Sequence, residues 1–215
     1  MNLRDLIDQC RNETRDTSVP YLWSDPEWTG YLNEAADEAC IRARLIENEG
    51  LELDSSAGDP YADIPDYVWS IQRVTFNGRK LILCDKQMLD DTEGLEWESR
   101  TADIPVACYE VGGKLRFYPI PAVAGEVFAH AFCTPSSQME DDEDEPQGIK
   151  PRLQGRITDW ALRCAYSKKD ADTFDGKQAE GYEVAFEKTF GPRPDEKAMR
   201  RLRINVRRHV KGAYF

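Results

Sequence analysis

The sequence predicts an α+β protein: a four-helix body, an inserted small antiparallel β-domain, and an extended basic C-terminal arm. Three observations support this fold class. Apolar residues recur with helical spacing before residue 50 and again after residue 148. Between residues 67 and 135 the apolar period is two, which is typical of strands. After Gly191-Pro192 the charge becomes strongly positive.

The helical body is expected to comprise residues 1–50 and 148–192. Asn2 can cap a first helix. The capping-box sequence Ser24-Asp25-Pro26-Glu27 predicts a second, longer helix that continues to Gly50. Two further helices are expected from about residue 153 to 165 and from about residue 171 to 190. The two halves are predicted to pack together through Trp28, Leu32, Trp160 and Phe186, although about 100 residues separate them.

The β-domain is expected to span residues 67–135, after a connector at residues 51–66 that is rich in Asp, Ser, Gly and Pro. Asn77-Gly78 predicts one hairpin turn, and Gly112-Gly113 predicts a second. The strands around these turns are expected at residues 69–76, 80–84, 106–111 and 114–119, with a fifth strand at residues 127–133.

Charge is distributed unevenly along the chain. The 215 residues carry a net charge of −12. Residues 193–215 hold eight basic and two acidic residues, a balance of +6 that leaves −18 for residues 1–192. The basic arm is predicted to be an extended docking element that reaches an acidic partner; the alternative is a solvated final helix that pairs with the acidic body. The docking residues expected in the arm are Lys197, Arg200, Arg201, Arg203, Arg207, Arg208 and Lys211.

Residues 136–147 contain six successive acids, from Glu140 to Glu145. Such a run repels itself, so a solvated loop is expected. It lacks the alternating ligands and turn glycine of a calcium loop, which makes a cation site a weak alternative.

No constellation of residues predicts an enzyme. The sequence has no phosphate-binding glycine loop and no GxSxG motif, and its two histidines are His130 and His209. We therefore expect no catalytic residue, no metal site and no cofactor. The six cysteines form no CxxC pair and are expected to be buried free thiols of a cytosolic protein. No signal peptide and no membrane-spanning segment are expected.

The order of these segments resembles the head–tail adaptor (connector, or head-completion) proteins of tailed bacteriophages. The residues that carry the resemblance are Trp28-x-x-x-Leu32-Asn33-Glu34-Ala35, Arg116-Phe117-Tyr118-Pro119-Ile120-Pro121, Trp160-Ala161-x-x-x-Ala165-Tyr166, and Asp170-Ala171-Asp172 leading to Phe186 and Phe190-Gly191.

The resemblance implies a structural virion protein without enzymatic activity. It implies a ring of twelve copies that joins the portal to tail proteins at the head–tail junction and continues the DNA channel. The basic arm would then contact the portal, and assembly would take place in the host cytoplasm. The main rival is a nucleic-acid-binding protein whose basic arm grips phosphates. Against this rival, the body is strongly acidic and the arm has no interleaved aromatic residue before Tyr214.

Overall fold

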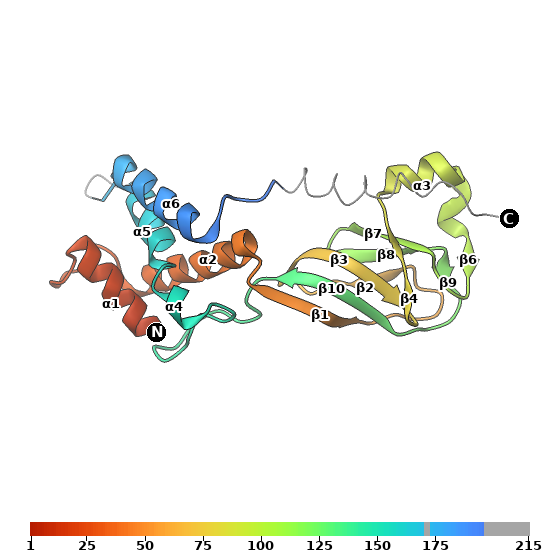
Figure 1. Cartoon of the computed structure of the whole chain (residues 1–215), viewed down its shortest axis with the longest axis horizontal. Helices are drawn as coiled ribbons and strands as arrows, with labels where there is room; N and C mark the ends of the chain where they lie inside the picture. The colour runs from red at the N-terminus through yellow and green to blue at the C-terminus, as the bar shows by residue number, and fades with distance from the viewer. Residues whose placement is uncertain (170–172, 196–215) are drawn as a thin grey trace. The chain divides into compact units, whose positions relative to one another are not determined.

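The computed structural model describes residues 1–169 and 173–195; residues 170–172 and 196–215 lie outside the described residues. The chain forms two compact units. The first unit comprises Met1–Ile46 and Cys133–Pro194, and it holds five of the six α-helices of the described residues (Figure 1). The second comprises, among the described residues, Glu47–Phe132 together with Asp195, and it holds most of the strands.

The first unit contains five α-helices within the described residues. The first two follow the capping signals of the sequence: Asn2 caps the first, and the amide of Ser24 donates to the Glu27 carboxylate (2.9 Å) at the start of the second. The helices are α1 (Leu3–Thr14), α2 (Asp25–Ala43), α4 (Pro151–Gln154), α5 (Thr158–Ser167) and α6 (Gly176–Phe190).

One buried cluster holds this unit together. α1, α2, α5 and α6 all contribute large apolar side chains to it. Trp160 of α5 packs against Phe186 of α6 with ring centroids 5.2 Å apart. Trp28 and Leu32 of α2 are fully buried in the same cluster. The described residues before position 47 and those between positions 133 and 194 therefore contribute to one core.

The second unit is built from two four-stranded sheets and a two-stranded one. The first sheet has the order β1-β10-β3-β4 and the second has the order β2-β8-β7-β5, while β6 pairs with β9. Their strands are β1 (Ile46–Leu53), β2 (Tyr61–Asp63), β3 (Val68–Phe76), β4 (Arg79–Lys80), β5 (Ile82–Leu83), β6 (Thr101–Ala102), β7 (Ala107–Val111), β8 (Lys114–Tyr118), β9 (Ile120–Pro121) and β10 (Val127–Cys133).

Both predicted hairpin turns are confirmed. β3 and β4 pair across Asn77-Gly78, whose φ angles are 48° and 75°. β7 and β8 pair across Gly112-Gly113. Phe76 of the first four-stranded sheet meets Phe117 of the second edge to face, with centroids 5.9 Å apart. The two sheets thus share an apolar interior.

The predicted four-helix body with a small inserted β-domain is wrong, although the chain is α+β. The helix expected from about 153 to 165 is divided into α4 and α5, which gives the first unit five helices. The β part is larger than expected because ten strands form in the described chain, and β5–β7 and β6–β9 are parallel pairs in what was expected to be an antiparallel sheet. Whether the C-terminal arm is extended lies outside the described residues.

Three local expectations also differ from the structure. The helix expected to reach Gly50 ends at Ala43, because Arg44 adopts a left-handed conformation (φ 51°) and β1 begins at Ile46. The connector expected at residues 51–66 contains the end of β1 and all of β2. Asp90, Asp91 and Glu93 precede Gly94 in the sequence, and acids before a glycine predict a solvated turn. The segment instead forms helix α3 (Lys86–Glu93), which is capped by Asp85 and followed by the 3-10 turn Leu95–Ser99.

Candidate assembly surfaces

The acidic run of residues 140–145 is anchored at the start of α1. The amide of Leu3 donates to the Asp144 carbonyl (2.8 Å), and the amide of Arg4 donates to the Asp142 carbonyl (3.1 Å). Amides in the first turn of a helix have no partner within the helix. The run therefore satisfies two of them, and it is an irregular segment with fixed contacts to α1.

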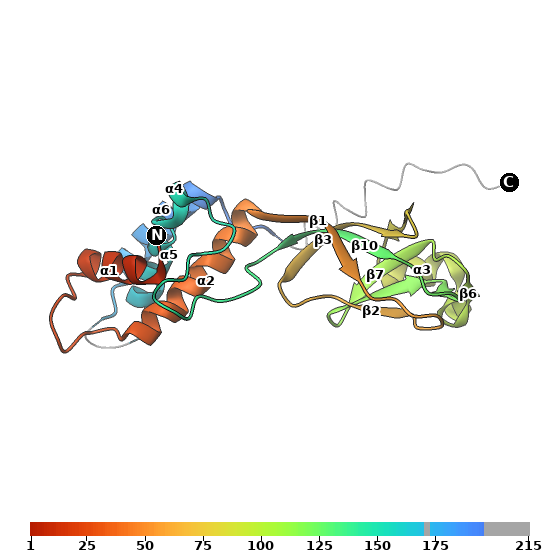
Figure 2. The ribbon, with the colours of Figure 1, turned by 90° about the horizontal axis from the view of Figure 1, so that it is seen from below.

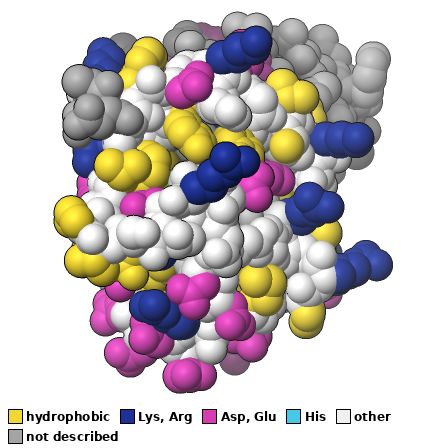
Figure 3. Space-filling model, turned by 90° about the vertical axis from the view of Figure 1, so that its left-hand side faces the viewer, with side chains coloured by type: hydrophobic (Ala, Val, Ile, Leu, Met, Phe, Trp, Pro, Cys, Tyr) yellow, Lys and Arg dark blue, Asp and Glu magenta, His cyan; other side chains and the backbone are white. Residues whose placement is uncertain are grey.

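A turn within the run directs most of its carboxylates outward. The Asp144 carboxylate accepts from the amides of Glu140 (2.8 Å) and Asp141 (2.9 Å), and these bonds hold the pKa of Asp144 below its usual range. Glu140, Asp141, Asp142, Glu143 and Glu145 are exposed. Acidic side chains gather at the lower side of the face in Figure 3. This part of the first unit is a strongly negative surface.

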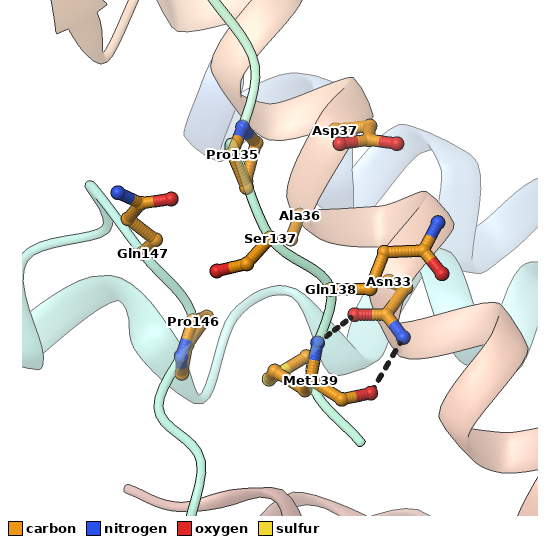
Figure 4. A pocket seen from close by; sticks show the side chains of 9 residues that line it. All are labelled: Asn33, Ala36, Asp37, Pro135, Ser137, Gln138, Met139, Pro146 and Gln147. Atoms are coloured by element: carbon orange, nitrogen blue, oxygen red, sulfur yellow. Dashed lines mark hydrogen bonds between the residues drawn. The ribbon is translucent and has the colours of Figure 1, made fainter. Parts of the chain in front are cut away.

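Asn33 of α2 fixes the other end of the same segment. Its amide group donates to the Met139 carbonyl (3.0 Å) and accepts from the Met139 amide (2.8 Å), as Figure 4 shows. The hollow beside this pair is lined by Ala36, Asp37 and Pro146, among others. Burial there raises the pKa of Asp37, with a further contribution from Glu34. The acidic surface is thus attached to two helices.

The root of the C-terminal segment is bound to α2. The Arg42 side chain is buried; it donates to the Glu38 carboxylate (2.8 Å) and to the Gly191 carbonyl (3.5 Å). Arg193 also pairs with Glu38, at 3.3 Å. The segment therefore leaves α6 along a fixed path as far as Arg193. The seven predicted docking residues all lie outside the described residues: Lys197, Arg200, Arg201, Arg203, Arg207, Arg208 and Lys211.

The four predicted packing residues lie together in the interior of the first unit. Trp28, Leu32, Trp160 and Phe186 belong to one buried cluster. The indole Nε1 of Trp160 donates to Glu34 (3.1 Å), and the guanidinium of Arg42 lies 4.8 Å from the centre of its ring. These aromatic side chains are buried within the unit.

The histidine and cysteine side chains of the described residues, which are residue types that can act in catalysis, are paired with a carboxylate or buried. His130 lies on β10 with its Nε2 2.6 Å from a carboxylate oxygen of Glu47. Burial raises the pKa of Cys40 to about 12 and also raises the pKa of Cys10, so both thiols are protonated at neutral pH. Within the described chain, no group of three or more His, Cys, Asp or Glu side chains is arranged to hold a metal ion. No described helix is long and apolar enough to cross a membrane.

Sequence reasoning missed the acidic strand β1. Glu47, Glu49 and Glu52 are exposed on it, and β1 is the edge strand of its sheet, beside β10 (Figures 1 and 2). Residues 46–50, with Glu47 and Glu49, were expected to be helical, and Glu52 was expected in the connector that follows. The alternation from Ile46 to Glu49 was the signal that could have indicated a strand.

The chain matches a protein family but no individual curated protein. The family model described as SU10 adaptor protein matches residues 1–208, which is nearly the whole chain. The match confirms the resemblance to phage head–tail adaptors that the sequence indicated. The chain therefore belongs to the SU10 adaptor protein family and is a structural adaptor protein of a bacteriophage.

Proposed function

We propose that this protein forms a ring at the head–tail junction of the virion. The ring, of twelve copies, joins the portal to tail proteins and continues the channel through which DNA passes. Membership of the adaptor family is the observation that carries this proposal. The ring assembles in the host cytoplasm, needs no cofactor and performs no catalysis.

The charge of the protein suits a DNA channel. Residues 1–192 carry a net charge of −18, and the exposed carboxylates at positions 140–143 belong to this part. Like charge repels the phosphate backbone, so DNA can slide past such a surface without being held. A basic channel would release counterions on binding and would retain the DNA.

Exposed apolar side chains on the first unit supply candidate contacts between copies. Val19, in the loop between α1 and α2, is 79% exposed, and Val184 on α6 is 61% exposed. Both elements belong to the same compact unit. In a ring, one surface of each copy meets a different surface of the next copy. Such a contact needs two separate apolar surfaces on each copy, and Val19 and Val184 are candidates for them.

Native mass spectrometry of the full chain, with and without portal rings, tests ring formation. We expect a species of about twelve copies when portal rings are present. Val19→Asp and Val184→Asp should reduce this species, and Val123→Asp is the matched control because Val123 is 44% exposed in a loop of the second unit. A protein that stays monomeric with portal rings present would contradict the proposal.

The basic arm is proposed as the portal contact. Removing residues 196–215 deletes the seven docking cations and leaves every described helix and strand in place. We expect the shortened chain to keep its melting temperature and to lose attachment to portal rings in a sedimentation assay. Attachment with unchanged affinity would assign the portal contact to the body.

A further inference from the structure

The outer face of the β1–β10–β3 sheet combines acidic and aromatic side chains. On β10, Val127, Ala129, Ala131 and Cys133 are buried, so the alternate residues Phe128, His130 and Phe132 point to the opposite face. Trp69 of β3 stacks on Phe132, with ring centroids 6.3 Å apart. Glu47 of β1 contacts His130, which places β1 beside this aromatic row, and Glu49 and Glu52 are the other exposed acids of β1. We call Glu47, Glu49, Glu52, Phe128, His130, Phe132 and Trp69 the acidic–aromatic face.

This face offers the exposed glutamates of β1, apolar rings and a hydrogen-bond donor, and it also carries one cation, Arg73, which is exposed on β3 four residues after Trp69. β1 carries Glu47, Glu49 and Glu52 and no basic residue. Phe128 is 38% exposed. The indole Nε1 of Trp69 is shielded from solvent, and within the part of the chain that the structure describes it has no hydrogen-bond acceptor. Such a surface fits a segment that brings cations and backbone carbonyls.

We propose that the basic segment 197–211 of this protein binds to the acidic–aromatic face. The segment carries seven Lys and Arg residues and no acid, so its charge complements the glutamates of β1. Arginine also stacks on aromatic rings, which the row on β10 and β3 provides. Ile204, Val206 and Val210 supply apolar side chains for Phe128.

The length of the segment is sufficient. Fifteen extended residues span up to about 50 Å. A strand of seven to nine residues, such as β10 or β3, is roughly 23–30 Å long. The segment can therefore run along the whole face.

The acidic run of residues 140–145 is the competing surface for the same cations. The hollow at this run is lined by Ser137, Gln138, Met139, Glu140, Asp141, Asp144 and Glu145, none of which is aromatic. It offers charge without rings, and the Asp144 carboxylate already accepts two backbone amides. The acidic–aromatic face is therefore the better match for a segment rich in arginine.

Zero-length carbodiimide cross-linking of the full chain, without any portal present, tests the proposal independently of portal attachment. The reagent joins a lysine amine to a carboxylate that it contacts. We expect Lys197 or Lys211 to be linked to Glu49 or Glu52. If the yield of this cross-link stays constant on dilution, the segment binds the face of its own chain. If the yield falls on dilution, the segment binds the face of a second copy. Either result supports the proposal. Links to residues 140–145 alone, or no link to β1, would overturn it.

Limited trypsin digestion supplies a second measurement. Cleavage after Arg203 and Arg207 should be roughly threefold to tenfold faster in Glu49→Gln/Glu52→Gln than in the natural protein, because two ion pairs are lost. Glu140→Gln/Asp141→Asn is the matched control, since it also removes two exposed acids. Equal cleavage rates in both double variants would contradict binding at β1.

Discussion

At the scale of a single residue, Trp160 joins the two halves of the first unit. It is 4% exposed, packs on Phe186 and donates to Glu34. Trp160→Ala should lower the free energy of unfolding by about 3–5 kcal/mol, because it leaves a large cavity in a packed core. Urea unfolding measures this change. Trp160→Phe keeps a ring in the core and should cost less; equal losses in the two variants would show that the indole volume is not what matters.

Glu27 is the residue whose ionisation should affect stability in acid. Its carboxylate accepts from Lys168 and from the amide of Ser24, and these bonds lower its pKa to about 2. A lowered folded-state pKa stabilises the folded protein above the unfolded-state pKa, near 4.5, and the stabilisation is lost as the pH falls toward 2. Because the group is partly exposed, we expect only about 0.5–1 kcal/mol.

Comparing the natural protein with Glu27→Gln by thermal melting tests this expectation. At pH 7 the variant should melt at a lower temperature. The difference should shrink between pH 4.5 and pH 2, where Glu27 becomes protonated in the unfolded state and then in the folded state. A difference that does not change with pH would assign the effect to the shape of the side chain.

At the scale of elements, two glycines with open surroundings should respond in opposite directions to alanine. A Cβ atom at either Gly30 or Gly78 would meet nothing within 4 Å. Gly30 lies inside α2, so Gly30→Ala should stabilise the protein by about 0.5–1 kcal/mol. Gly78 has φ 75° in the β3–β4 turn, so Gly78→Ala should destabilise it by about 1–2 kcal/mol. Changes of the same sign in urea unfolding would contradict the assigned conformations.

Elements with local signals could be predicted from the sequence. The two hairpin turns and the starts of α1 and α2 depend on residues within a few positions of each other. The end of α2 could not be predicted in the same way. Ile46-Glu47-Asn48-Glu49 fits a helix end or a strand, and pairing with β10, about 80 residues later, decides between them.

The candidate surfaces could also be predicted only where they depend on residues close together in the sequence. Six successive acids indicate exposure, and most of these side chains are exposed. That the run holds the start of α1 could not be predicted, because the bonds join Asp142 and Asp144 to residues about 140 positions away. The acidic–aromatic face depends on β1 lying beside β10, so it became visible only with the sheet order.

At the scale of the whole molecule, charge separates an adaptor from a protein that acts by binding DNA. The chain carries −12 overall, and its eight C-terminal cations follow a body of −18. Binding to duplex DNA needs cations that displace the counterions of the phosphates, and repulsion from the body opposes this. If the basic segment also binds the acidic–aromatic face, its lysine and arginine side chains are already paired with carboxylates and not with phosphates.

The full chain should therefore not shift duplex DNA in an electrophoretic assay at about 150 mM salt. A synthetic peptide of residues 195–215, free of the acidic body, should bind DNA at low salt. Its affinity should fall steeply as salt is added, with a slope near −0.9 for each phosphate it neutralises. Glu49→Gln/Glu52→Gln in the full chain should give at most weak binding, since most of the acidic charge remains. Tight DNA binding by the natural protein at 150 mM salt would favour the nucleic-acid-binding function over the adaptor ring.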